Sequence, residues 1–416
     1  MAKMKSIDDF DFRSKTVLLR VDINSPIDPN TKLIVNENRI QKSLPTIQKL
    51  LDKGAMLAII AHQGDTLDYQ NLIPLEEHAR KLSGYLGIDV GYIDDVSGPA
   101  AQERVKTLQP GEAVILGNLR YLSEEISTFE NAVKLKPTEM LDTYLIRGLA
   151  PIVDYYVNDA FAAAHRNAPS MVAFQELKPT AAGDLLFHEV AALTTVMAAP
   201  EHPSVFVLGG AKISDAFGMM KNVLESGTAD KILTCGVTGE IMLLAAGYRL
   251  GEIKERFLAD RCLDVFVADA EAYLREFDSR IEFPKDLAYA VDGTRHEIAI
   301  EDLPVEQLFM DIGAKTIANY EQEIGQSKTL FVNGPAGVYE DPVFEDGTKA
   351  ICNAIADADG YSVIGGGDTV TAATKFVDLD KIDYVCTAGG AMVRYLSGKK
   401  LPLIEAMEKA YQRDSA

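Results

Sequence analysis

The sequence predicts an α/β protein whose sheets are mostly parallel and covered by helices on both faces. Short, β-rich apolar runs recur along the chain and alternate with longer stretches of helical periodicity. The apolar runs are nearly continuous, which is typical of strands buried on both faces of a parallel sheet. The chain has 416 residues, more than one ordinary core holds, so two domains are expected.

In the first half of the chain, the predicted strands finish mainly in charged or polar residues. They are TVLLRVDI at 16–23, MLAIIAH at 56–62, AVILG at 113–117 and IVDYYVND at 152–159. In parallel sheets, ligands bind at the carboxyl ends of the strands. These polar ends therefore predict a domain, residues 1–173, that grips a small polar anion.

In the second half, glycines end or follow the predicted strands. These are SVFVLGG at 204–210, KILTCG at 231–236, TLFVNG at 329–334, YSVIGG at 361–366 and DYVCT at 383–387, which Gly389 and Gly390 follow. Glycine lets a phosphate approach bare backbone, so residues 204–401 are predicted to bind nucleotide. The boundary is expected in 174–203, where a helix-like stretch ends at two prolines, Pro200 and Pro203.

The composition narrows the classes of function. A formal charge of -21 disfavours nucleic acid and anionic membranes, so an anion site must concentrate positive charge locally. The four cysteines are widely spaced, which suggests neither a zinc site nor a disulfide framework and favours a reduced, cytoplasmic setting. The amino-terminal segment lacks an apolar signal core, and no apolar run is long enough to span a membrane.

Four arginines of the first half, namely Arg20, Arg39, Arg120 and Arg166, lie where strands end or helices begin. The guanidinium fork matches phosphate and carboxylate. Asp22 and Asn24 follow Arg20 at period two, so they are expected on the same face of its strand and could accept from a substrate hydroxyl. His62 and His165 could donate to an anion. Surface ion pairs, turn caps and core histidines explain the same residues. Spacing alone does not bring them together.

Three glycine-rich segments of the second half join a strand to a helix: LGGAK at 208–212, GGGDT at 365–369 and TAGGA at 387–391. A helix amino terminus attracts phosphate, and Lys212 adds a positive charge. Asp368 is either a Mg²⁺ anchor or a helix N-cap. Glu340, at the end of NGPAGVYE, could accept from ribose hydroxyls, although most glycine loops are only tight turns. Neither GxxxxGK[ST] nor GxGxxG occurs, which argues against a Walker-type site and a nicotinamide oxidoreductase.

Together these segments resemble the phosphoglycerate kinase family over nearly the whole chain. The runs that carry the resemblance are LLRVDINSPID, NRIQKSLPTI, AHQGD, LGNLRY, VNDAFAAAHRNAPS, LGGAKISDA, NGPAGVYE, GGGDTVTAA and CTAGGAMVRYLSGKKLP. AHQGD and LEEHA look closer to the archaeal branch. The resemblance implies two Rossmann-like lobes joined by a hinge, hinge-bending, and a final segment, 402–416, that packs back on the first lobe.

The resemblance also implies a glycolytic transferase that moves a phosphoryl group from 1,3-bisphosphoglycerate to Mg-ADP, giving 3-phosphoglycerate and ATP. Its partners are small molecules, with no nucleic acid and no membrane, in a monomer or homodimer. Arg39 and Lys212 match the family's stabilisers of the transferring phosphoryl group. The residues implied for 3-phosphoglycerate are Asp22, Asn24, Arg39, His62, Arg120 and Arg166. Those implied for nucleotide are Gly209, Gly210, Ala211, Lys212, Gly236, Asn333, Pro335, Val338, Glu340, Gly367, Asp368 and Thr369, with Gly366, Gly389 and Gly390 at the transferring phosphate and Asp368 at Mg²⁺.

The sequence departs from the family pattern at four positions. Asp65 stands where arginine is frequent, Ala216 where a second lysine is, Ala388 where a glycine is, and Val332 where tryptophan is. Asp65 leaves open a kinase for another acyl phosphate. Ala216 and Ala388 leave open a weakly active nucleotide-binding paralogue. The retained Arg39 and Lys212 favour an active enzyme.

Overall fold

The computed structural model describes residues 3–65 and 72–415. The chain forms two compact units, residues 1–191 with 400–416 (unit 1) and residues 192–399 (unit 2). The division falls inside helix α7 (Asp184–Ala198), within the segment 174–203 in which the sequence places the boundary. Each unit is described by itself.

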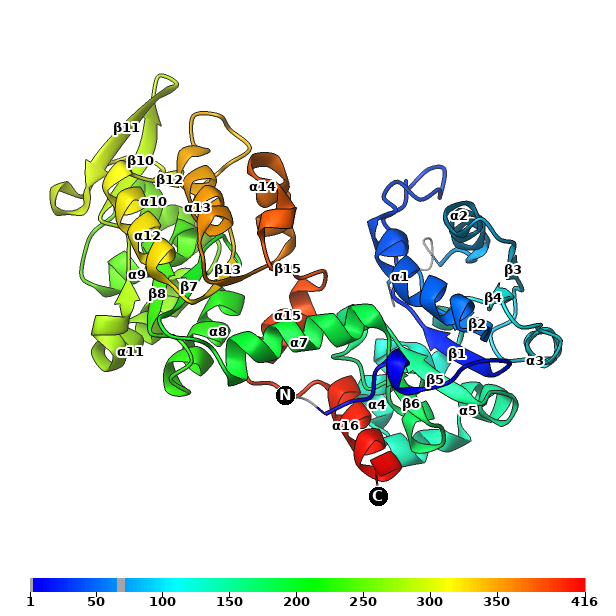
Figure 1. The fold of residues 1–416 in the computed structure, drawn as a ribbon. Coiled ribbons are helices and arrows are strands. Elements are labelled where there is room, and N and C mark those ends of the chain that lie inside the picture. The colour runs from blue at the N-terminus through cyan, green and yellow to red at the C-terminus, as the bar shows by residue number, and fades with distance from the viewer. Residues whose placement is uncertain (1–2, 66–71, 416) are drawn as a thin grey trace. The chain divides into compact units, whose positions relative to one another are not determined.

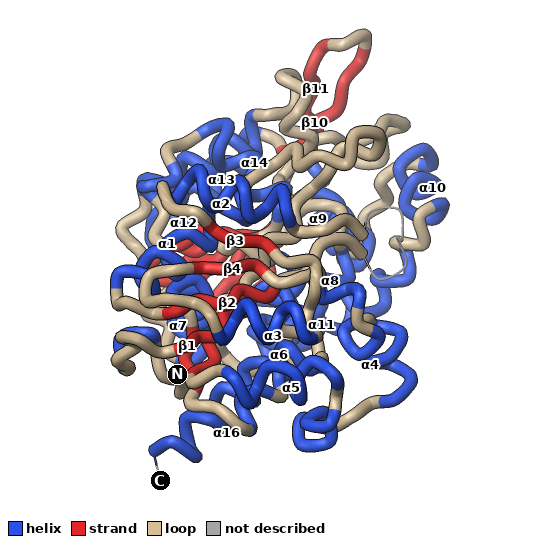
Figure 2. Tube along the Cα trace, turned by 90° about the vertical axis from the view of Figure 1, so that its right-hand side faces the viewer, coloured by secondary structure: helices blue, strands red, loops and turns tan. Residues whose placement is uncertain are grey.

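Unit 1 contains a six-stranded sheet of order β3-β4-β2-β1-β5-β6, and every pair in it is parallel. All its carboxyl ends therefore lie at one edge, and Figure 2 shows β3, β4, β2 and β1 in this order. The strands are β1 (Thr16–Arg20), β2 (Met56–Ile60), β3 (Val90–Tyr92), β4 (Ala113–Ile115), β5 (Tyr155–Asn158) and β6 (Thr180–Ala182).

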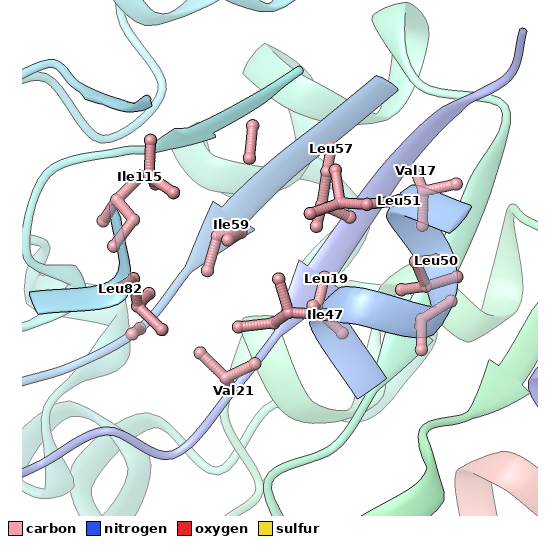
Figure 3. Close-up of a cluster of buried hydrophobic side chains, with 14 of the residues drawn as sticks. Val17, Leu19, Val21, Ile47, Leu50, Leu51, Leu57, Ile59, Leu82 and Ile115 are labelled. Carbon is pink, nitrogen blue, oxygen red and sulfur yellow. The ribbon is translucent and has the colours of Figure 1, made fainter. Parts of the chain in front are cut away.

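The helices of unit 1 bury apolar residues, except for one short helix, Ser127–Val133, in which no residue is buried. They are α1 (Asn38–Asp52), α2 (Glu76–Leu86), α3 (Pro99–Lys106), α4 (Ser127–Val133), α5 (Tyr144–Leu149), α6 (Pro169–Val172) and α16 (Pro402–Ser415). Figure 3 shows the core under α1, where Ile47 and Leu50 lie against Leu19 and Val17 of β1 and Leu57 of β2. The apolar positions of α1 recur at helical spacing, which explains why one face is buried.

The carboxyl-terminal helix α16 belongs to unit 1. Its first turn donates from the Leu403 amide to the Ala164 carbonyl at 3.2 Å. Near its other end, Arg413 donates to the carbonyls of Lys178, at 2.8 Å, and of Gln175. The structure thus holds this last segment on the amino-terminal part of the chain by bonds at both ends of the helix.

Unit 2 repeats the plan with a six-stranded parallel sheet of order β15-β14-β13-β7-β8-β9. Its strands are β7 (Ser204–Leu208), β8 (Lys231–Thr234), β9 (Ile281–Glu282), β13 (Thr329–Asn333), β14 (Tyr361–Gly365) and β15 (Tyr384–Val385). Its helices are α8 (Ile213–Glu225), α9 (Gly236–Ala245), α10 (Glu252–Asp260), α11 (Val267–Phe277), α12 (Ala314–Gln326), α13 (Asp346–Asp357), α14 (Gly367–Phe376) and α15 (Gly389–Leu396).

A small antiparallel sheet in unit 2 was not predicted. Its order is β11-β10-β12, from β10 (Asp286–Val291), β11 (Thr294–Ala299) and β12 (Asp311–Ile312), and its hairpin stands away from the parallel sheet (Figure 1). The turn is Asp292-Gly293, with φ of 50° and 76°. An Asp-Gly pair with positive φ at both residues favours a two-residue hairpin, so a local signal for this element was present.

Each of the nine predicted strand runs contains a strand, and the predicted fold class is confirmed. The prediction that Asp22 and Asn24 lie on a strand is wrong, because β1 ends at Arg20, opposite the last paired residues of β2 and β5. Beyond them, a turn forms in which the Asn24 amide donates to Asp22 Oδ1 at 3.2 Å. No helix among the described residues is long and apolar enough to cross a membrane.

Candidate active site

A buried arginine organises the carboxyl edge of the unit 1 sheet. Arg20, the last residue of β1, is 3% exposed. Its Nη2 lies 3.0 Å from His62 Nδ1, its Nε donates to Ser170 Oγ at 3.4 Å, and its Nη1 donates to the Val21 carbonyl. The sequence grouped Arg20 with the other arginines as an anion ligand. In the structure the Arg20 guanidinium donates to groups of the protein itself, so Arg20 holds His62 and Ser170 in place and is not itself placed as an anion ligand.

Two further arginines meet at one backbone carbonyl. Arg120 Nη1 donates to the Glu125 carbonyl at 2.6 Å, and Arg166 Nη2 donates to the same oxygen at 3.4 Å. Arg166 also pairs with Glu130 at 2.6 Å. The buried Glu125 carboxylate accepts from the Ser170 amide at 2.7 Å and from its hydroxyl at 2.6 Å. Sequence reasoning missed Glu125, because nothing in SEE at 123–125 distinguishes an acid buried among arginines from one on the surface.

Asp22 and Asn24, in the loop after β1, bond to helix α1 and to the loop after β2. Asp22 is buried and accepts from Arg39 Nη1 at 2.8 Å, while the Arg39 side chain remains 44% exposed. The guanidinium is thus oriented by one bond and keeps donors for a ligand. Asn24 Oδ1 accepts from the Gly64 amide at 3.0 Å, which ties the loop after β1 to the loop after β2.

The charges of all four arginines act on His62. Burial holds the pKa of His62 well below its usual range, and the charges of Arg20, Arg120, Arg166 and Arg39 lower the pKa further. The ring is therefore neutral at neutral pH. Because Arg20 can only donate to Nδ1, the His62 proton is on Nε2, where it can serve an anionic ligand.

Arg120 keeps its charge in this setting. Burial, followed by the charges of Arg166 and Arg20, lowers the pKa of Arg120 to about 10, while Glu125 and Asp65 act in the opposite direction. The guanidinium is still protonated at neutral pH. Four arginines therefore lie at this sheet edge, as the sequence indicates, and the nearby acids Asp22, Glu125, Glu130 and Asp65 offset much of their positive charge.

A second polar cluster, also missed from sequence, locks the loops that carry these residues. Gln63 exchanges hydrogen bonds with the Ser25 backbone at 2.8 and 2.9 Å and with Asn118 at 3.1 and 2.9 Å. His78 Nε2 lies 3.1 Å from Gln63 Oε1, and burial lowers the pKa of His78 to about 4. Neutral His78 must donate here, because the Gln63 oxygen accepts. The strand-end loops after β1, β2 and β4 are thus one hydrogen-bonded assembly.

In unit 2, backbone rather than side chains builds the corresponding sheet edge. The Gly209 amide donates to the Asn333 carbonyl at 2.9 Å, and the Gly210 amide donates to the Pro335 carbonyl at 2.8 Å. The Gly334 amide donates to Thr369 Oγ1 at 2.6 Å. These bonds join the loops after β7, β13 and β14. The Thr369 hydroxyl takes part by accepting from the loop after β13.

The glycines of this edge fall into two groups. A Cβ on Gly209 would lie 2.5 Å from the Pro335 carbonyl oxygen, and one on Gly334 would lie 2.2 Å from the Gly209 carbonyl oxygen, so the fold requires both glycines. At Gly367 and Gly390 a Cβ would meet nothing within 4 Å. Neither packing nor a positive φ requires glycine at these two positions, which are the first residue of α14 and the second residue of α15. Their open backbone is free to contact a ligand.

A cavity of about 230 Å³ opens at the amino ends of α8, α14 and α15. Amide groups at helix amino termini attract anions. Lys212 Nζ and Asp368 Oδ2 are 3.9 Å apart in its wall, and both side chains are largely exposed. The predicted residues that line this cavity are Gly209, Gly210, Ala211, Lys212, Asn333, Pro335, Gly366, Gly367, Asp368, Thr369, Gly389 and Gly390.

A mostly apolar cavity of about 500 Å³ adjoins the first. The two share Gly210, Ala211, Pro335 and Asp368. Gly236, Val338 and Glu340, which the sequence assigned to the nucleotide, line it together with Phe257, Leu308 and Phe309. An apolar slot beside a cradle of amides suits a flat base with a phosphate chain.

The donor set of unit 2 fits one cation held largely by a ligand. Among the described residues, no group of three or more His, Cys, Asp or Glu side chains comes together as a metal cage. Asp368 offers an exposed carboxylate at the phosphate cradle, and Asp215 lines the same cavity. Mg²⁺ is commonly bound by one or two carboxylates together with substrate phosphates and water, so this arrangement fits the ion.

The comparisons with known proteins agree with this geometry. The profile described as "Phosphoglycerate kinase" matches residues 7–399. Phosphoglycerate kinase from Methanothermobacter thermautotrophicus is 41% identical over 98% of this chain and 97% of its own, and that from Methanothermus fervidus is 39% identical over 99% of each. The crystal structure of phosphoglycerate kinase from Pyrococcus horikoshii covers 99% of this chain and 100% of its own, at 37% identity and a TM-score of 0.86.

A structure of phosphoglycerate kinase from Coxiella burnetii is also similar, at 30% identity, 98% and 99% coverage and a TM-score of 0.84. The predicted resemblance, including its archaeal leaning, is confirmed. The matches do not favour a kinase for another acyl phosphate or a weakly active nucleotide-binding paralogue. The chain therefore belongs to the phosphoglycerate kinase family, and it is a phosphotransferase whose acceptor is a carboxyl group.

Proposed function

We propose that unit 1 binds 3-phosphoglycerate or 1,3-bisphosphoglycerate and that unit 2 binds Mg-ADP or Mg-ATP. The observation that carries the first half is that arginines gather at this sheet edge: Arg20 lies against His62, and Arg120 and Arg166 share the Glu125 carbonyl. Arg39, Arg120 and Arg166 would hold the substrate phosphate and carboxylate, since each is charged and Arg39 keeps much of its surface open. Asp22, Asn24 and His62 would orient the hydroxyl and the acid group.

Unit 2 would hold the nucleotide with its phosphates on the backbone cradle and its base in the apolar cavity. Gly366, Gly367, Gly389 and Gly390 would donate amides to the phosphoryl group in transfer, supported by Lys212. Glu340 and Val338, both exposed in the apolar cavity, would contact the ribose and base. Asp368 would hold Mg²⁺, which when bound neutralises charge on the nucleotide phosphates.

For this transfer the protein has mainly to position the two substrates and to stabilise the negative charge of the transferring group. The acceptor carboxylate is ionised at neutral pH, so no general base has to remove a proton. The transferring group carries spread negative charge between two oxygens roughly in line. Arg39 and Lys212 would stabilise that charge, and direct transfer requires the two bound substrates to meet. A hinge near 174–203 stays a prediction from sequence, as do the cytoplasmic location and the state as monomer or homodimer.

Turnover with 3-phosphoglycerate and Mg-ATP, in a coupled assay that detects ADP, tests the proposed function. We expect turnover by the wild-type chain and a strong loss for Lys212→Ala. A matched control is Lys221→Ala, which removes another exposed lysine of the same region, on α8. Turnover by the wild type no higher than by Lys212→Ala would reject the proposed role of the cradle.

A further inference from the structure

A buried ion pair lies in the wall of the apolar cavity of unit 2. Lys254 of α10 and Glu240 of α9 are 4% and 5% exposed in their side chains, and Lys254 Nζ lies 2.7 Å from Glu240 Oε1. Both residues line the apolar cavity, and neither lines the phosphate cradle. The pair is therefore at the base end of the proposed nucleotide site, away from the phosphates.

The donors of Lys254 are engaged within the protein. Besides Glu240, the ammonium donates to the Phe309 carbonyl at 3.2 Å and lies 4.8 Å from the centre of the Phe257 ring. A lysine ammonium has three donors and no acceptor. These three contacts leave little of Lys254 for a ligand, and they fix the carboxylate of Glu240 in place.

Glu240 has the opposite balance. Among the described residues, its second oxygen, Oε2, is buried and has no hydrogen-bond partner. A buried acceptor without a donor is costly, and the cost is relieved when a ligand supplies the donor. Asp311 lines the same cavity with a similarly unpartnered Oδ1, but Gly337 and Gly347 pack so closely on that oxygen that a Cβ on either would lie within 2.6 Å of it. Of the two buried, unpartnered carboxylate oxygens in this cavity wall, that of Glu240 is thus the one left for the base.

We propose that Glu240, held by Lys254, is a specificity-determining residue that selects purine nucleotides with a 6-amino group over those with a 6-oxo group. An exocyclic amino group donates to the carboxylate oxygen. A 6-oxo group would place an acceptor against an acceptor, inside a cavity where water cannot easily compensate. The inference rests on the proposed binding of nucleotide by unit 2 and adds which base that site selects.

Binding of three diphosphates to the full-length wild-type chain tests the inference without any substitution. The probes are ADP, inosine diphosphate and purine riboside diphosphate, which carry an amino group, an oxo group and hydrogen at position 6. By calorimetry we expect ADP to bind best and inosine diphosphate worst, with a ratio on the order of tenfold to a hundredfold. Equal binding of ADP and inosine diphosphate, or of ADP and purine riboside diphosphate, would overturn the role of Glu240.

A double variant, Glu240→Gln with Lys254→Met, links the preference to this pair. Removing both charges together avoids leaving a single buried charge unpaired. We expect the ratio of ADP to inosine diphosphate affinity to fall about tenfold or more, toward unity, with ADP still bound. Glu323→Gln is the control: it removes another acid of unit 2 from an ion pair, the one with Lys231, and should leave the ratio unchanged. An unchanged ratio in the double variant would refute the inference.

The outcomes separate this inference from the function on which it rests. If the wild-type chain binds none of the three diphosphates, the proposed nucleotide site is wrong and the inference fails with it. If it binds them without regard to position 6, the nucleotide site stands and only the role of Glu240 is lost. Selective binding that the double variant abolishes supports both.

Discussion

The two units have the same sheet plan and yet build their binding edges from different material. In unit 1 the edge consists of charged side chains, with Arg39, Arg120 and Arg166 around a neutral His62. In unit 2 it consists of backbone amides and glycines at the starts of three helices. Both edges lie at the carboxyl ends of parallel strands, where such sheets bind ligands.

The difference follows from what each edge is proposed to hold. A small acid has two anionic groups and a hydroxyl in fixed positions, which side-chain forks can match one by one. A chain of phosphates needs close approach along its length, and only glycine leaves the amides that open. If these proposals hold, side chains would select the small acid in unit 1, and open backbone would give the nucleotide phosphates space in unit 2.

The largest effects should come from the two cations proposed to stabilise the transferring group, one from each unit. We expect Arg39→Ala and Lys212→Ala each to lower kcat by a factor that corresponds to about 2–4 kcal/mol, as for other electrostatic stabilisers. Steady-state turnover measures this loss. A kcat for either variant close to that of wild type, within about a factor of two, would show that its unit supplies only binding.

Glycine substitutions sharpen the claim that unit 2 uses open backbone. Gly390→Ala should leave the free energy of unfolding unchanged or slightly higher, because its Cβ meets nothing within 4 Å, and should raise KM for the nucleotide about tenfold. Gly334→Ala should instead cost on the order of 2 kcal/mol or more of stability, because its φ is 94° and its Cβ would collide with Gly209.

Denaturant unfolding and nucleotide kinetics on the same two variants check this pair of expectations. If Gly390→Ala keeps the wild-type KM, the amides at the start of α15 do not contact the phosphates. If Gly334→Ala is as stable as wild type, the close packing of the strand-end loops is not what requires glycine there.

The pH dependence of unfolding tests whether a buried polar side chain, His78, contributes to the stability of unit 1. The folded-state pKa of His78 is about 4, below the ordinary value of 6.5, so the unfolded state binds the proton first as the pH falls. His78 therefore stabilises the fold less and less as the pH falls from 6.5 toward 4. The wild type should lose up to about 1.4 kcal/mol per pH unit more than His78→Gln over this window. Urea unfolding at several pH values measures the difference, and parallel pH profiles would contradict it.

The smallest effect is expected at Asp65, where an acid replaces a frequent arginine. Asp65 is exposed and acts on Arg120 through its charge, which limits its influence. Asp65→Asn should lower KM for 3-phosphoglycerate by about two- to fivefold, the scale of an exposed charge. Asp52→Asn, at the far end of α1, is a control for net charge. A higher KM for Asp65→Asn would mean that the acid helps to bind substrate.

Local signals in the sequence were enough to predict the fold class and the glycine-rich carboxyl edge of the unit 2 sheet. The strand runs, the helix starts at Gly367 and Gly389 and the glycine pair at Gly209 all depend on neighbours in the chain, so the pattern predicts them. β1 was predicted too long, because its end is set by where β2 and β5 stop pairing. An apolar run does not contain that information.

The buried polar groups could not be predicted, because their partners are distant in sequence. Glu125 meets Ser170 and the His78 ring meets Gln63 only through the fold. In the sequence, nothing distinguishes Glu240 and Lys254 from exposed helix residues, and only the structure shows that they form a buried ion pair. Residue type and position likewise made Arg20 a candidate anion ligand, although its donors are used within the protein.

The division of labour between the two edges is tested most directly by measuring KM for both substrates in one variant from each unit. Arg166→Ala should raise KM for 3-phosphoglycerate at least about tenfold while KM for Mg-ATP stays near the wild-type value, and Gly390→Ala should do the reverse. If either variant instead raises both KM values together, or raises the KM of the substrate assigned to the other unit, the assignment of one substrate to each unit is wrong.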